Sequence, residues 1–121
     1  NLATDEDESN DTLITEVSSL LPISDTGAYY IYSNTTGGEP WFVVSNDTHM
    51  DDVFGAGNWI QANFSTPPAT IFVPGTQFVF IEGGDGNGIG CTNYMNANIA
   101  LIEAWVNAGG RLFRGACATQ R

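Results

Sequence analysis

Residues 77–116 constrain the fold of this chain more than any other part of the sequence. The segment opens with a continuous apolar run of strand length at 77–82 and continues into a glycine-rich loop at 83–90. An amphipathic helix is predicted from residue 92 or 93 to 107, ended by glycines, and a final strand at 111–116. Strand, helix and strand in this order form a βαβ unit, which implies a parallel pair and a right-handed crossover. The uninterrupted apolar run is typical of a central strand buried on both faces.

The sequence before this unit predicts further elements of the same sheet. Residues 28–33 are β-branched and aromatic and lie between turn-forming residues, which predicts a strand. Residues 41–44 form a second apolar run of strand length, and 59–64 predicts a third, short strand. Capping residues at 45–47 precede a short helix at 48–54. We therefore expect an α/β fold with a small, mainly parallel sheet and flanking helices.

The N-terminal part has a different composition. Residues 1–12 are polar and acidic and predict an extended arm, whereas 13–121 predict a single domain. Residues 13–23 are more apolar, and their pattern fits either a short helix or an extended arm. The apolar side chains near helical spacing are Leu13, Ile14, Val17, Leu20 and Leu21.

The charge of the chain excludes two classes of partner. There are 14 acidic residues against three basic ones, for a formal net charge of -11. Nucleic acids and anionic membranes both require a basic surface, so neither is expected as a partner. No run approaches the roughly 20 apolar residues that a membrane-spanning helix needs.

The charges are also unevenly placed along the chain. The acidic arm contains Asp5, Glu6, Asp7, Glu8 and Asp11, and the basic residues near the other end are Arg111, Arg114 and Arg121. One interpretation is a solvated acidic tail. The other is head-to-tail attraction between subunits, which produces rings or filaments when the interface is heterologous.

Cysteine usage and glycosylation motifs indicate an exported protein. Cys91 and Cys117 are the only cysteines, and in an oxidising compartment they would form one disulfide, the alternative being two reduced, buried thiols. Four asparagines stand in N-x-[ST] motifs, which are acceptors for N-linked glycans. They are Asn10, Asn34, Asn46 and Asn63.

The glycine-rich loop invites a ligand-binding interpretation. Its glycines alternate along 84–90 as G-x-G-x-G-x-G, which is neither the dinucleotide-binding G-x-G-x-x-G nor a P-loop with its lysine. Asp85 and Asn87 with loop carbonyls would be the ligands of a Ca²⁺ ion, but the twelve-residue calcium loop is missing. We expect a close-packed crossover loop and no cofactor.

Other patterns of catalytic residues are incomplete. Cys91 opens the predicted helix, but the only histidine, His49, lies far upstream and supplies no base for a nucleophile. Glu82 and Asp85 follow the central strand, where ligands of open α/β sheets bind, and with Asn87 they form the candidate ligand crevice. No residue is assigned a catalytic or metal-binding role, and the chain is expected not to be an enzyme.

Five segments resemble an α/β domain of large secreted surface proteins of Bacteroidetes-type bacteria. They are residues 33–41, Met50 with 53–55, Asn58-Trp59, residues 78–83 and residues 101–112. The last of these is also similar to the helix–Gly-Gly–strand corner of glutamine-amidotransferase-like folds. The resemblance implies a flavodoxin-like three-layer fold in an adhesive or surface-display protein. It implies no catalytic residues, because the Cys–His–Glu set of the amidotransferases is absent here.

These observations favour a non-enzymatic extracellular structural or adhesion module, secreted or on a cell surface, that assembles through its N-terminal arm. Its partners would be neighbouring copies or surface glycans. One alternative is a carbohydrate-binding module with aromatic platforms beside residues 82–90; a second is a small hydrolase with its site in that loop. The aromatic candidates are Tyr29, Tyr30, Tyr32, Trp41, Phe42 and Trp59.

Overall fold

A computed structural model describes residues 27–33, 40 and 45–115. Several sequence expectations lie outside these residues and stay predictions. They are the acidic arm at 1–12, the segment 13–23, the strand at 41–44, Cys117 and Arg121.

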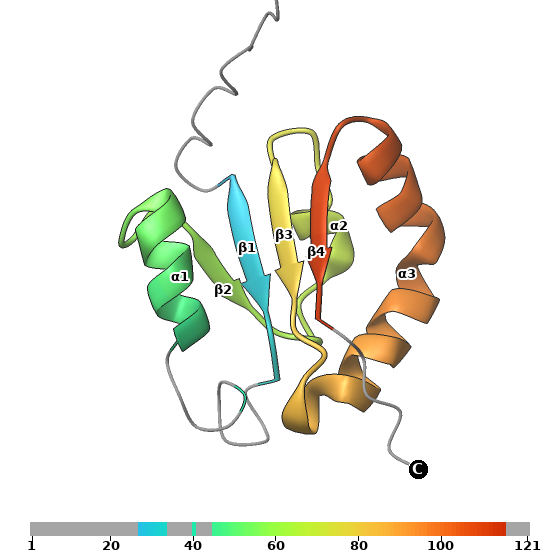
Figure 1. The fold of residues 1–121 in the computed structure, drawn as a ribbon. Helices are drawn as coiled ribbons and strands as arrows, with labels where there is room; N and C mark the ends of the chain where they lie inside the picture. Colours follow the sequence, from blue (N-terminus) through green and yellow to red (C-terminus); the bar gives the residue numbers. More distant parts are fainter. Residues whose placement is uncertain (1–26, 34–39, 41–44, 116–121) are drawn as a thin grey trace, which may run out of the picture.

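The core of the fold is one four-stranded parallel sheet (Figure 1). Its strands are β1 (Ala28–Ile31), β2 (Ile60–Ala62), β3 (Phe78–Ile81) and β4 (Arg111–Arg114). They are arranged in the order β2-β1-β3-β4, which is the order of the first four strands in flavodoxin-like sheets. The predicted α/β class with a parallel sheet is confirmed, and β3 is an interior strand as its apolar run indicated.

The helices lie on both faces of this sheet. α1 (Ser45–Phe54) connects β1 to β2, α2 (Pro68–Ile71) connects β2 to β3, and α3 (Gly88–Asn107) connects β3 to β4. The first connection runs toward one edge of the sheet and the other two run toward the opposite edge. Because parallel crossovers share one handedness, α1 is expected on one face, with α2 and α3 on the other. Figure 1 shows this arrangement.

Two apolar clusters hold the layers together. The larger cluster joins the sheet to α2 and α3 and includes Ile31, Val79, Ile81, Ile102 and Trp105. The smaller cluster, under α1, is largely aromatic. It contains Ala28, Tyr30, Tyr32 and Met50, with Phe54, Trp59, Phe78 and Phe80 packed against it.

Two elements differ from the sequence expectation. Residues 85–87 form a 3₁₀ turn and α3 begins at Gly88, so the predicted loop is irregular only at 83–84. Gly90 is required there because a Cβ atom would lie 2.6 Å from the Phe64 ring, which packs against this turn of α3. The segment 69–73, before the Pro74-Gly75 turn, carried no predicted element, yet Pro68–Ile71 is the short helix α2. Proline at the first turn favours this start.

Candidate functional site

The carboxyl ends of β1 and β3 form the switch point of the sheet, where successive connections leave in opposite directions. In open α/β sheets this is the usual place for a ligand crevice. Glu82 directly follows β3, and Ser33 lies two residues beyond the end of β1. Glu82 therefore lies at the carboxyl end of the strands, as the sequence predicted for the crevice.

The Glu82 side chain is buried at this switch point, with only 5% of its surface exposed. Its Oε2 accepts hydrogen bonds from the Tyr30 hydroxyl at 3.1 Å and from Asn46 Nδ2 at 2.9 Å. Its Oε1 accepts from the backbone N–H groups of Gly83 at 2.9 Å and Gly84 at 2.7 Å. A buried carboxylate is costly unless donors surround it, and here both oxygens are used. Glu82 thus ties β1, α1 and the glycine loop together.

The other two candidate crevice residues occupy different environments. Asn87 is buried, and its Oδ1 accepts a hydrogen bond of 2.6 Å from the backbone N–H of Ser33. This bond links the glycine loop to the end of β1. Asp85 is exposed and has a φ of +49°, a conformation that aspartate tolerates better than most residues. The structure therefore turns Glu82 and Asn87 into internal anchors and leaves only Asp85 toward solvent.

Asn46 belongs to this network, which sequence reasoning missed. Its Nδ2 donates to Glu82 and also, at 3.0 Å, to the Tyr30 hydroxyl. An N-linked glycan would replace one hydrogen of Nδ2 and remove one of these bonds. At Asn63 the backbone and Oδ1 are engaged with Thr66 and Ser65, and Nδ2 makes no hydrogen bond to the described residues. A glycan at Asn63 would therefore break no hydrogen bond of the described residues, whereas one at Asn46 would break one; both stay predictions, and Asn10 and Asn34 lie outside the described residues.

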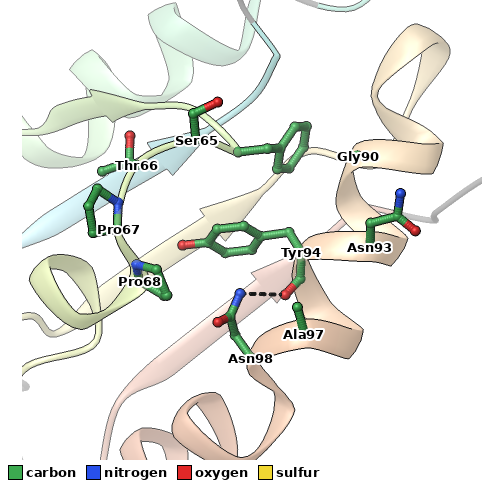
Figure 2. A pocket seen from close by; sticks show the side chains of 10 residues that line it. Ser65, Thr66, Pro67, Pro68, Gly90, Asn93, Tyr94, Ala97 and Asn98 are labelled. Atoms are coloured by element: carbon green, nitrogen blue, oxygen red, sulfur yellow. Dashed lines mark hydrogen bonds between the residues drawn. The ribbon is translucent and has the colours of Figure 1, made fainter.

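A shallow pocket of about 420 Å³ lies between the β2–α2 connection and the first half of α3 (Figure 2). Phe64 and Tyr94 contribute aromatic rings, and Pro67 and Pro68 form the opposite wall. The remaining lining residues are Ser65, Thr66, Gly90, Asn93, Ala97 and Asn98. None of these side chains is charged. The combination of rings, hydroxyls and amides suits a neutral, hydroxyl-rich ligand better than an ion.

Tyr94 packs beneath this pocket with 5% of its surface exposed. Its hydroxyl is buried and forms no hydrogen bond with any described residue, although Asn98 Nδ2 donates to its backbone carbonyl at 2.8 Å. Burial raises the pKa of Tyr94 to about 12, because the phenolate would lose its hydration. The hydroxyl is therefore neutral at physiological pH. Because it is buried without a hydrogen-bond partner among the described residues, it lowers the stability of the fold.

An apolar groove of about 520 Å³ lies on the other face of the sheet, between α1 and β4. Counting only described residues, this face carries one helix, α1, whereas the opposite face carries α2 and α3. Val53 on α1 and Phe113 on β4 are exposed by 71% and 56%. The groove is lined by Asn46, His49, Met50, Val53, Phe54, Phe78, Phe80, Arg111 and Phe113.

The structure separates the other residues singled out in the sequence. His49 is exposed beside the groove, while Cys91 is fully buried at the start of α3, and its predicted disulfide partner lies outside the described residues. Tyr30 and Tyr32 are buried, and Trp59 is half-buried. Arg111 and Arg114 are exposed on the edge strand β4. In residues 27–33, 40 and 45–115, no group of three histidine, cysteine or acidic side chains is placed to hold a metal ion.

Comparisons with known proteins return no relative of this chain. It matches no protein-family model, and searches of curated proteins and of solved structures found no similar protein. The resemblance to bacterial surface-protein domains therefore stays a prediction. Within the described part of the chain, no helix has the length and apolar character needed to cross a bilayer.

The Glu82 network generates a first prediction. In Glu82→Gln, an amide NH₂ replaces one acceptor oxygen and faces groups that are themselves donors. We expect the free energy of unfolding, measured by urea denaturation, to fall by about 2–4 kcal/mol. Glu103→Gln, which makes the same change at an exposed position of α3, is the control and should shift it by less than about 0.5 kcal/mol. Equal effects in the two variants would contradict the structural role of Glu82.

The Tyr94 hydroxyl generates a second prediction. Tyr94→Phe keeps the ring and removes the buried hydroxyl, so we expect the free energy of unfolding to rise by about 1 kcal/mol at pH 7. The unfolded phenol loses its proton near pH 10 and the folded one near 12. Between these values the unfolded state binds fewer protons, so the wild type should lose stability relative to the variant as pH rises. Denaturation of both proteins at pH 9 and 11 measures this; a constant difference would contradict it.

Proposed function

We propose that this chain is a non-enzymatic extracellular structural or adhesion module that self-associates through its acidic N-terminal arm. The observation that carries the proposal is the position of the basic residues. Two of the three in the chain, Arg111 and Arg114, are exposed on the edge strand β4. On a chain of net charge -11, this edge is a local positive surface that an acidic segment of another copy would contact.

The switch point supports a module without catalytic chemistry. The carboxylate of Glu82, the acidic candidate directly after β3, is saturated by four donors and buried. A general acid or base has to reach a substrate proton, and this carboxylate presents no free oxygen. Asp85 alone remains exposed there, without a second carboxylate of the predicted crevice to act with it.

Extracellular location rests on the sequence. The glycosylation motifs, the pair of cysteines and the absence of lysine are all features of exported proteins. The structure is compatible with a glycan at Asn63, close to the surface of the β2–α2 connection. A surface or matrix protein is the corresponding context.

Charge-matched variants test self-association. Arg114→Gln and Gln61→Glu each make the chain more negative by one unit, but at opposite edges of the sheet, because Gln61 is exposed on β2. Sedimentation velocity over a range of salt concentrations measures the association. We expect Arg114→Gln to weaken it by about two- to fivefold at low salt, as for a partly exposed ion pair, and Gln61→Glu to leave it nearly unchanged.

Deletion of residues 1–12 should abolish the association, and raised salt should weaken it in the wild type. A monomer under all conditions, or association indifferent to salt and to Arg114→Gln, would overturn the proposal.

A second candidate is a carbohydrate-binding module that uses the pocket of Figure 2. The observation favouring it is the fully uncharged lining, in which Pro67, Pro68 and the Phe64 ring border the amides of Asn93 and Asn98. A neutral-glycan array tests it: we expect binders to lose signal in Asn98→Ala. An array without binders would remove this candidate.

A further inference from the structure

We propose that residues 13–23 of the same chain dock as a helix into the apolar groove between α1 and β4. The inference goes beyond self-association, because it concerns how one copy completes its own fold. Among the described residues this face carries one helix, α1, which contacts Phe78 of β3 through Phe54, with ring centroids 5.1 Å apart. No described helix lies above Phe113 of β4, which also lines the groove and is 56% exposed. An exposed apolar patch of this kind marks a contact surface.

The chain enters the sheet beside this groove. The carbonyl of Gly27 accepts hydrogen bonds from the backbone N–H groups of Gln77 at 2.8 Å and Phe78 at 3.1 Å. In the register of the sheet, Ala28 pairs with Phe78, and Phe78 pairs with Arg111. Residue 27 thus lies at the same end of the sheet as the first residue of β4. Two strand spacings, or about 10 Å, separate them. Residues 24–27 can span about 13 Å, which covers that distance.

The sequence of residues 13–23 fits the groove in pattern and length. Its apolar residues at 13, 17, 20 and 21 recur at the spacing of one helix face. As a helix, residues 13–21 are about 13 Å long, which fits beside the roughly 15 Å of the ten-residue α1. Pro22 is placed where the helix has to end before the chain turns into β1.

The charges agree with this direction. Since residue 23 is nearest to β1, the carboxyl end of the docked helix lies at the end of the sheet where β4 begins. Arg111 lines the groove at that point and is the one basic Arg or Lys among its described lining residues. A cation beside the carboxyl end of a helix is favourable, because the last carbonyl groups carry partial negative charge. The acidic residues 5–11 then precede the helix at its positive end and stay available to a neighbouring copy.

Docking within one chain is favoured over docking between copies. A short tether holds the segment at an effective concentration in the millimolar range beside its own groove. A neighbouring copy reaches that concentration only in very concentrated solution.

Hydrogen exchange of the full chain, followed by mass spectrometry, tests the proposal. We expect the amides of residues 17–21, which have intrahelical acceptors, to exchange at least about tenfold more slowly than those of a free peptide of residues 13–23, at every protein concentration used. Phe113→Asp, in the groove, and Leu20→Asp, in the segment, should each abolish this protection. Ile99→Asp is the matched control, since Ile99 is 46% exposed on α3, an element of the opposite face.

Protection of β3 in the same spectra reports that each variant is folded, and Leu20→Asp alters no described residue. Absence of protection at residues 17–21 in the wild type would overturn the proposal. So would protection that survives both groove and segment variants. Protection that appears only together with dimers at high concentration would show exchange between copies and overturn docking within one chain.

Discussion

The buried carboxylate of Glu82 is the interaction on which this end of the molecule depends. It joins the end of β3 to Tyr30 on β1, to Asn46 on α1 and to the first two residues of the glycine loop. A charge in this position is stable only while its donors stay in place, so the network fixes the four segments relative to one another. The same contacts occupy the place where related architectures bind ligands. Among the described residues, the contacts that stabilise this end of the molecule are therefore the same ones that occupy the Glu82 carboxylate.

The handedness of parallel connections explains the remaining asymmetry. One connection runs toward β2 and two run toward β4, so in the described part of the chain two helices cover one face and one covers the other. The groove beside β4 is a consequence of this count and not of a particular side chain. Its aromatic floor and the arginines of β4 make this edge the surface available for contacts. Both the proposed self-association and the proposed docking of residues 13–23 use that edge.

Local patterns predicted much of the fold. The apolar run before the glycine loop and the amphipathic helix after it identified β3, α3 and β4, because both periods are set by neighbouring residues. The patterns failed where a distant contact decided the outcome. Gly88 and Gly90 read as loop residues, yet they belong to α3, where Phe64 packs against Gly90. No local pattern indicated that the Asn46 amide donates to Glu82 and Tyr30.

The sequence by itself determined the α/β class, the central place of β3 and the separation of acidic and basic residues along the chain. The first two follow from the spacing of apolar residues within single elements, and the third can be read directly along the chain. Only the tertiary structure decided that Glu82 is an internal anchor and that Arg111 and Arg114 lie on an edge strand beside an apolar groove. The reason is physical: Glu82 and Asn46 are 36 positions apart, and nothing in either local sequence specifies the partner that the fold brings within 2.9 Å.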